Sequence, residues 1–198
     1  MNLPNKLTVA RFGLTVVFLW AMFSKFAYND TLALFFFCLA GITDFLDGRI
    51  ARSRNLITNF GKLMDPLADK IMVCSAFIAL VESTHLNPDA PVKVGAWMVV
   101  VIVARELAIT GLRLLAASKN IVLAAERYGK HKTISQIVCL IALLLMDACQ
   151  EWPAALKDLF MPWVPTFAEI MLWLTVVLTA MSGMIYLWRN RELYLNDL

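Results

Sequence analysis

The sequence predicts an all-α integral membrane protein, folded as a single domain over residues 1–198, and three observations indicate this class. Apolar residues make up 60% of the chain, whereas soluble domains contain about 45–50%. The mean hydropathy is +0.69. Six apolar segments can be drawn, and each is long enough to cross a hydrocarbon core of about 30 Å at about 1.5 Å per helical residue.

The six segments are expected to form six transmembrane helices in order along the chain. Polar or proline-containing stretches separate them and supply the turns. Lys6 and Arg11 precede an apolar run from Phe12 to Phe23, as in a signal peptide, but no small-x-small cleavage site comes after the run, so we expect an uncleaved first helix. In order, the segments span residues 7–27, 31–50, 64–83, 93–117, 133–150 and 165–188.

The basic residues predict the orientation of the chain in the membrane. With both termini in the cytoplasm, all but three of the 18 Lys and Arg residues fall at inner helix ends or inner loops. The three on the outer side are Lys25, Lys93 and Lys157. An odd number of spans would destroy this distribution. The net charge of +3 is too small to indicate a nucleic-acid partner.

Two pairs of aspartates lie on the second and third segments. At 100° per helical residue, Asp44 and Asp47 share one face of a helix, and Asp65 and Asp69 share a face of the next. Four carboxylates that meet from two helices repel one another unless cations lie between them, and hard oxygen ligands suit Mg²⁺, Mn²⁺ or Ca²⁺. Pro66 is best tolerated in a first helical turn, so we expect the third helix to start near Asp65.

These acids belong to a longer motif. The pattern D-x2-D-G-x2-A-R-x8-G-x3-D-x3-D runs from Asp44 to Asp69 and resembles the signature of the CDP-alcohol phosphotransferases, integral membrane enzymes that build phospholipids. The stretch Pro4–Arg11 resembles the family's P-N-x-L-T-x-x-R entry to its first helix. The resemblance implies that an acceptor hydroxyl attacks the lipid-bearing phosphorus of CDP-diacylglycerol and that CMP leaves. It also implies Mg²⁺ (or Mn²⁺), a homodimer, and a multi-pass location in the inner membrane with the active site facing the cytoplasm.

The resemblance assigns a role to each residue of the motif. Asp44, Asp47, Asp65 and Asp69 would bind the metal, and Asp69 would also be the general base for the acceptor hydroxyl. The remaining residues would bind CDP-diacylglycerol, and they are Gly48, Ala51, Arg52, Thr58, Gly61, Asn5, Thr8 and Arg11. Asn5 has an alternative role as the N-cap of the first helix.

Basic residues later in the chain indicate the acceptor. Arg105 and Arg113 lie on one side of the fourth segment. Lys130 and Lys132 lie beside the start of the fifth, where a helix N-terminus favours anions. Cationic groups that converge from two helices suit an acceptor that itself carries a phosphate, and glycerol 3-phosphate is the simplest. We therefore expect these four residues to bind the acceptor phosphate.

The same segments are similar to those of family members that use glycerol 3-phosphate. The similarity covers Ala104–Arg113 and Gly129–Thr133. The predicted reaction is therefore transfer of the phosphatidyl group from CDP-diacylglycerol to glycerol 3-phosphate. The enzyme is expected to be surrounded by membrane lipid. For Arg105 and Glu106 the alternative is a buried ion pair with a structural role.

Three other functions fit part of the pattern. A phosphatidylserine, phosphatidylinositol-phosphate or cardiolipin-type synthase would share the aspartate motif and differ in its acceptor. A membrane prenyltransferase also uses helix-borne aspartates on a pyrophosphate, but its two Asp-rich motifs lie on distant helices. A secondary transporter would show repeated halves and broken helices near the midplane, and no such repeat is visible.

Overall fold

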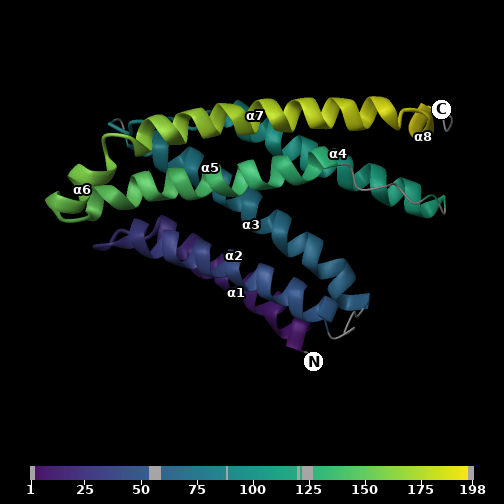
Figure 1. Ribbon diagram of the computed structural model, residues 1–198, viewed down its shortest axis with the longest axis horizontal. Helices are drawn as coiled ribbons and strands as arrows, with labels where there is room; N and C mark the ends of the chain where they lie inside the picture. The colour runs from purple at the N-terminus through teal and green to yellow at the C-terminus, as the bar shows by residue number, and fades with distance from the viewer. Residues whose placement is uncertain (1–2, 54–58, 88, 120, 122–126, 196–198) are drawn as a thin grey trace.

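The computed structural model describes residues 3–53, 59–87, 89–119, 121 and 127–195, and every regular element in these ranges is an α-helix (Figure 1). The helices are α1 (Leu3–Phe23), α2 (Asn29–Ser53), α3 (Asn59–Leu86), α4 (Ala96–Ser118), α5 (Arg127–Glu151), α6 (Ala154–Phe160), α7 (Val164–Arg189) and α8 (Glu192–Leu195).

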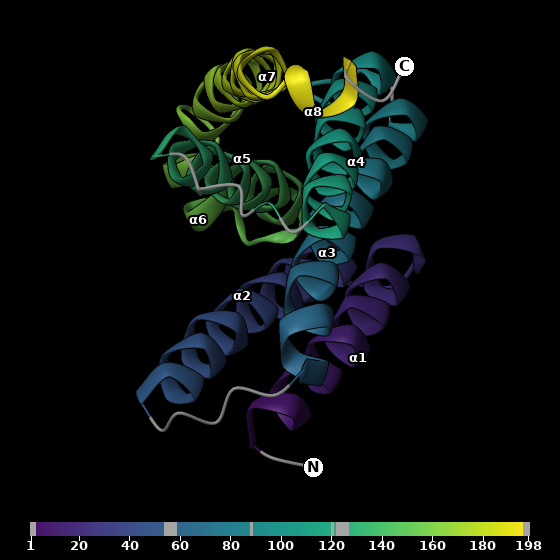
Figure 2. The ribbon, with the colours of Figure 1, turned by 90° about the vertical axis from the view of Figure 1, so that its right-hand side faces the viewer.

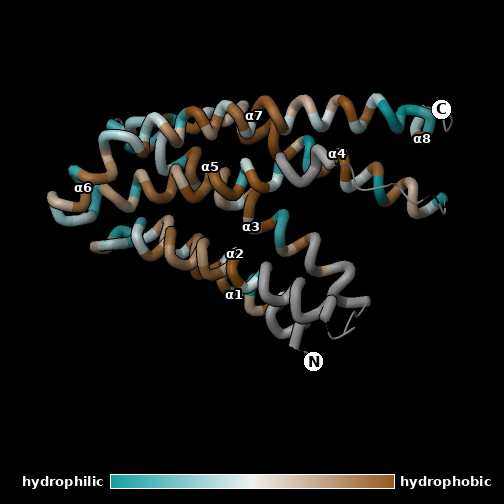
Figure 3. The backbone as a smooth tube through the Cα atoms, viewed as in Figure 1, coloured by the Kyte–Doolittle hydropathy of each residue, from teal (hydrophilic) through white to brown (hydrophobic). Residues whose placement is uncertain are grey.

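Six of these helices are long, and each overlaps most of one of the six apolar segments. Among the described residues, Lys132–Glu151 and Val164–Arg189 are long and apolar enough to cross a membrane by length and composition. The hydrophobic colour that runs along α5 and α7 in Figure 3 follows from this composition. α4 is apolar up to Ala104 and carries charges at Arg105, Glu106 and Arg113. The all-helical class is confirmed, and the six-span arrangement stays a prediction.

Several helix ends differ from the sequence prediction, and three of them bear on the site. α3 begins at Asn59, so Pro66 lies inside the helix and Asp65 is not its first residue. A proline removes one backbone hydrogen bond from the helix, but it does not prevent earlier residues from forming helical turns. α1 begins at Leu3, so Asn5 lies within the helix and is not its N-cap. α2 extends to Ser53, three residues beyond the predicted end.

The long helices form two pairs, with α3 between them. α1 packs on α2, and α5 packs on α7. α3 contacts α1, α4 and α5, and in Figure 2 it connects the lower part of the molecule to the upper part. The core contains fully buried aromatic and aliphatic side chains from several helices, among them Phe18, Phe37, Phe77, Leu80, Leu140 and Leu143.

The start of α2 is held by the end of α5. Glu151 accepts hydrogen bonds from the backbone N–H of Asp30 at 3.0 Å and from the N–H and hydroxyl of Thr31 at 2.9 and 2.7 Å. The indole N–H of Trp152 donates to the same hydroxyl at 3.0 Å. A carboxylate at a helix N-terminus satisfies free N–H groups and interacts favourably with the helix dipole. This contact fixes α2 at the end far from the aspartates.

Candidate active site

α2 and α3 carry the aspartate motif, and the structure describes one side chain from each pair. Asp44 lies in α2 and Asp69 lies in α3. The Asp69 carboxyl interacts electrostatically with Asp44 and with Arg11 of α1. Two acids that are far apart in the motif therefore lie close enough to interact, and the convergence of all four stays a prediction.

Arg11 forms an ion pair with Asp44. The distance from Nη1 of Arg11 to Oδ1 of Asp44 is 2.7 Å. The arginine side chain is 0% exposed, whereas the aspartate is 47% exposed. Thr8, three residues earlier on α1, is also buried. α1 thus contributes a buried cation directly beside the motif, where the sequence placed Arg11 as a ligand of the donor phosphates.

The described donor set fits a divalent cation in its chemistry. Asp44 and Asp69 present carboxylate oxygens, the ligand type that Mg²⁺ and Mn²⁺ prefer. Asp44 is half exposed, so its carboxylate has room for another partner besides Arg11. Within the described residues, no three His, Cys, Asp or Glu side chains gather as a metal cluster. The helices α2 and α3 also carry Asp47 and Asp65, whose side chains the structure does not describe.

Several predicted site residues lie outside the described side chains, and their roles stay predictions. Thr58 lies in the stretch 54–58, which the structure does not describe. For the others the structure gives the helical backbone alone, and they are Asn5, Asp47, Gly48, Ala51, Arg52, Gly61, Asp65 and Lys130.

A second charged cluster lies beside Asp69, where α4 meets α5. Lys132 of α5 donates to Oε1 of Glu106, and Nη1 of Arg105 lies 3.2 Å from the same oxygen. Asp69 interacts electrostatically with Lys132 and Glu106. The structure therefore brings together two of the four residues predicted for the acceptor phosphate. It joins them through Glu106, so the ion pair between Arg105 and Glu106, which was the alternative, is present.

Lys70 extends this cluster, and sequence reasoning missed it. Its ammonium donates to the hydroxyl of Thr110, which in turn donates to the backbone carbonyl of Glu106 at 2.7 Å. Lys70 also interacts electrostatically with Glu106, Arg113 and Asp69. The sequence signal for Lys70 was its position directly after Asp69. Adjacent helical residues point about 100° apart, so a residue next to Asp69 can contact a different neighbouring helix.

Arg113 occupies a separate position further along α4. Its Nε lies 3.5 Å from the hydroxyl of Tyr186 on α7, and its guanidinium carbon lies 5.9 Å from the ring centroid. Its link to the cluster is electrostatic, through Lys70. Tyr186 is buried and was not among the predicted site residues. Nothing in the sequence pattern distinguishes it from other aromatic residues of α7.

α7 accommodates Arg105 through a glycine. A Cβ added at Gly183 would lie 2.8 Å from Cγ of Arg105, closer than side chains normally approach. Gly183 is buried in the packing between α4 and α7. The absent side chain leaves the space in which Arg105 lies, so this glycine also belongs to the structure of the site.

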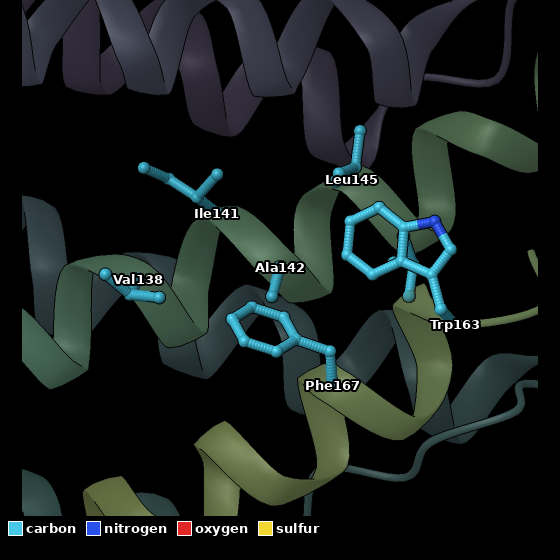
Figure 4. Close-up of a pocket in the computed structure, with 7 residues that line it drawn as sticks. Val138, Ile141, Ala142, Leu145, Trp163 and Phe167 are labelled. Atoms are coloured by element: carbon cyan, nitrogen blue, oxygen red, sulfur yellow. The ribbon is translucent and has the colours of Figure 1, made fainter. Parts of the chain in front are cut away.

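An apolar cavity of about 130 Å³ lies between α5 and the start of α7 (Figure 4). Figure 4 shows the rings of Trp163 and Phe167 at one side and Val138, Ile141 and Leu145 at the other. The lining offers no charged group for a phosphate or a metal ion. This cavity is therefore not the place where the two charged clusters would act.

Comparison with known proteins gives the family. The profile of the family described as CDP-alcohol phosphatidyltransferase matches residues 1–181. A curated CDP-diacylglycerol–glycerol-3-phosphate 3-phosphatidyltransferase of Bacillus subtilis (strain 168) is 40% identical, over 96% of both chains. Proteins of the same name from Rickettsia felis and Salmonella typhimurium are each 34% identical, the first over 93% of both chains and the second over 72% of this chain and 76% of its own. The chain therefore belongs to the CDP-alcohol phosphatidyltransferase family.

Proposed function

We propose that this chain is a phosphatidyltransferase that moves the phosphatidyl group of CDP-diacylglycerol to glycerol 3-phosphate, giving phosphatidylglycerophosphate and CMP. The names of the relatives from Bacillus, Rickettsia and Salmonella support both substrates. The family match over residues 1–181 supports the reaction type.

One structural observation carries the proposal: Asp69 interacts electrostatically with two charged clusters. On one side it interacts with Asp44 and Arg11, and on the other with Glu106 and Lys132. The first cluster belongs to the aspartate motif, which suits the pyrophosphate of the donor. The second contains cations from two helices, which suit the phosphate of the acceptor. An aspartate that interacts with both clusters supports the assignment of Asp69 to the reacting hydroxyl.

The chemistry balances around that aspartate. The acceptor hydroxyl oxygen forms a bond to the phosphorus that carries diacylglycerol, and the bond from that phosphorus to the bridging oxygen of the pyrophosphate breaks. The bridging oxygen leaves with CMP. Asp69 takes the proton of the hydroxyl, the role of a general base within hydrogen-bond reach of its substrate. Lys132, Arg105, Arg113 and Lys130 bind the acceptor phosphate.

The donor is bound by the motif and by α1. Asp44, Asp47, Asp65 and Asp69 would hold a divalent ion, Mg²⁺ or Mn²⁺, which when bound neutralises pyrophosphate charge and stabilises the leaving phosphate. Small residues at 48, 51 and 61 leave room for the nucleotide. The remaining predicted donor contacts are Arg52, Thr58, Asn5, Thr8 and Arg11.

The arrangement in the membrane follows from the same proposal. The six long helices span an inner membrane as one domain, both termini lie in the cytoplasm, and the aspartates lie in the cytoplasmic half. The chain forms a homodimer through surfaces of α3 to α5. Crosslinking in native membranes and accessibility of single introduced cysteines test these two statements.

CMP release by the purified protein tests the activity. The assay contains CDP-diacylglycerol in mixed micelles and Mg²⁺, with or without glycerol 3-phosphate. We expect CMP to appear when glycerol 3-phosphate is present, and Asp69→Asn to lower its rate by at least about 100-fold, within the range for loss of a general base.

The same assay separates the rival acceptors. Serine, inositol phosphate and phosphatidylglycerol replace glycerol 3-phosphate in parallel reactions. If any of them supports CMP release as fast as glycerol 3-phosphate does, the chain has another acceptor and the proposed substrate is wrong.

A further inference from the structure

Glu106 belongs to the second charged cluster, where α4 meets α5, and joins cations from these two helices. A single oxygen, Oε1, accepts from Lys132 of α5 and lies 3.2 Å from Nη1 of Arg105. We propose that Glu106 is a positioning residue, which holds Lys132 and Arg105 together as a preformed site for the acceptor phosphate. This inference rests on the proposed acceptor, because it gives the cluster the task of binding a phosphate.

Burial explains why Lys132 needs a carboxylate. Lys132 is 5% exposed and Glu106 is 7% exposed. An ammonium group that is removed from water and left without an opposite charge is strongly destabilised, so it loses its proton or moves away. Glu106 therefore keeps Lys132 charged and in place while no acceptor is bound.

The cluster contains a buried hydrogen-bond donor that is available to a ligand. Nε of Arg105 is buried and has no hydrogen-bond partner among the described residues. Buried polar groups in folded proteins are nearly always paired, so an orphan donor indicates a missing ligand or water. Arg105 uses Nη1 on Glu106 and retains Nε for another acceptor. A phosphate oxygen satisfies that donor without displacing Glu106.

The charges around Glu106 leave a positive surplus that suits a phosphate monoester. Lys70 interacts with Glu106, Asp69, Arg105 and Arg113, and Lys132 interacts with Glu106, Asp69 and Arg105, so this group contains four cations and two carboxylates. The surplus is two positive charges. A phosphate monoester carries about −1.5 to −2 at pH 7, so it neutralises the cluster. Glu106 thus holds the cations in place without neutralising the positive charge of the site.

Steady-state kinetics of Glu106→Gln test the proposal. The amide keeps the size of the side chain and removes its charge. We expect the KM for glycerol 3-phosphate to rise by about 10- to 100-fold, the range for loss of a charged hydrogen bond. We expect the KM for CDP-diacylglycerol to stay within about twofold of wild type, since a positioning role acts on one substrate.

Two further variants connect the effect to Lys132. Glu106→Asp keeps the charge on a shorter side chain, and we expect its acceptor KM to lie between those of wild type and Glu106→Gln. In Glu106→Gln combined with Lys132→Met, no buried charge of this pair remains, so the protein is expected to fold. Its acceptor KM should exceed that of Lys132→Met alone by much less than the Glu106→Gln factor, because only the contact with Arg105 is then left to lose.

Asp147→Asn is the matched control. Asp147 is also 7% exposed and lies on α5, 15 residues after Lys132, or about 22 Å along the helix. We expect this change to affect thermal stability and to leave both KM values unchanged.

Two results would overturn the role of Glu106. One is a Glu106→Gln protein that resembles Asp147→Asn, less stable but with a normal acceptor KM. The other is a double variant whose acceptor KM exceeds that of Lys132→Met by the full Glu106→Gln factor. Failure of the proposed function is distinct, since the wild-type protein would then release no CMP in response to glycerol 3-phosphate.

Discussion

Replacing Gly183 of α7 by alanine should impair the proposed acceptor site, because the new side chain displaces Arg105 of α4. The new Cβ would lie 2.8 Å from Cγ of Arg105, and ordinary contact begins at 3.4 Å, so Cγ must move by about 0.6 Å. The contact of Arg105 with Glu106 is 3.2 Å, and a shift of this size takes it beyond normal hydrogen-bond length. Alanine also favours the helix by about 1 kcal/mol, which offsets much of the overpacking.

The KM for glycerol 3-phosphate and the melting temperature are measured side by side. We expect the KM to rise by about three- to tenfold, with a change in melting temperature of only a few degrees. Gly111→Ala is the control, because it lies on α4 and a Cβ there would have nothing within 4 Å. We expect this control to have wild-type KM values and equal or higher stability. Indistinguishable kinetics for the two alanine variants would refute the argument that Gly183 makes room for Arg105.

Three further outcomes are expected. Removing divalent ions with EDTA should abolish CMP release, Mg²⁺ should restore it, and Asp44→Asn should need a higher Mg²⁺ concentration for half-maximal rate; activity in EDTA would contradict the metal assignment. Glu151→Gln should lower the free energy of unfolding by about 1–2 kcal/mol through its three bonds to the start of α2, with unchanged KM values, and a kinetic effect without a stability loss would be inconsistent with this role. Tyr186→Phe should raise the acceptor KM by less than about threefold, because the hydroxyl is 3.5 Å from Arg113 and the ring remains; a tenfold rise would show a larger role for the hydroxyl.

The sequence predicted the long helices well because apolar runs and turn residues mark them directly. It misplaced some ends because hydropathy detects only the apolar part of a helix. α3 starts at Asn59 and α5 at Arg127, in stretches whose polar residues carry no apolar signal. Pro66 was a poor guide to the start of α3, since a proline weakens a helix without excluding residues before it.

The pairing of charged side chains depends on which helices become neighbours and how each one is rotated. Periodicity along one helix grouped Arg105 with Arg113, yet in the structure Arg105 contacts Glu106 while Arg113 contacts Tyr186. The ion pair between Arg11 and Asp44 joins two segments whose contact no local pattern indicates. The sequence therefore predicted the residue types of the site better than their partners.

The packing of α3 explains how Asp69 can take part in both halves of the proposed reaction. This helix packs against α1 on one side and against α4 and α5 on the other. Asp69 therefore interacts with Arg11 and Asp44 through the first contact and with Glu106 and Lys132 through the second. A tilt of α3 would alter both sets of interactions at once, so we expect donor binding and acceptor binding to be coupled through this helix. The anchoring of Lys70 on Thr110 resists such a tilt, because it ties α3 to α4 one residue after the aspartate.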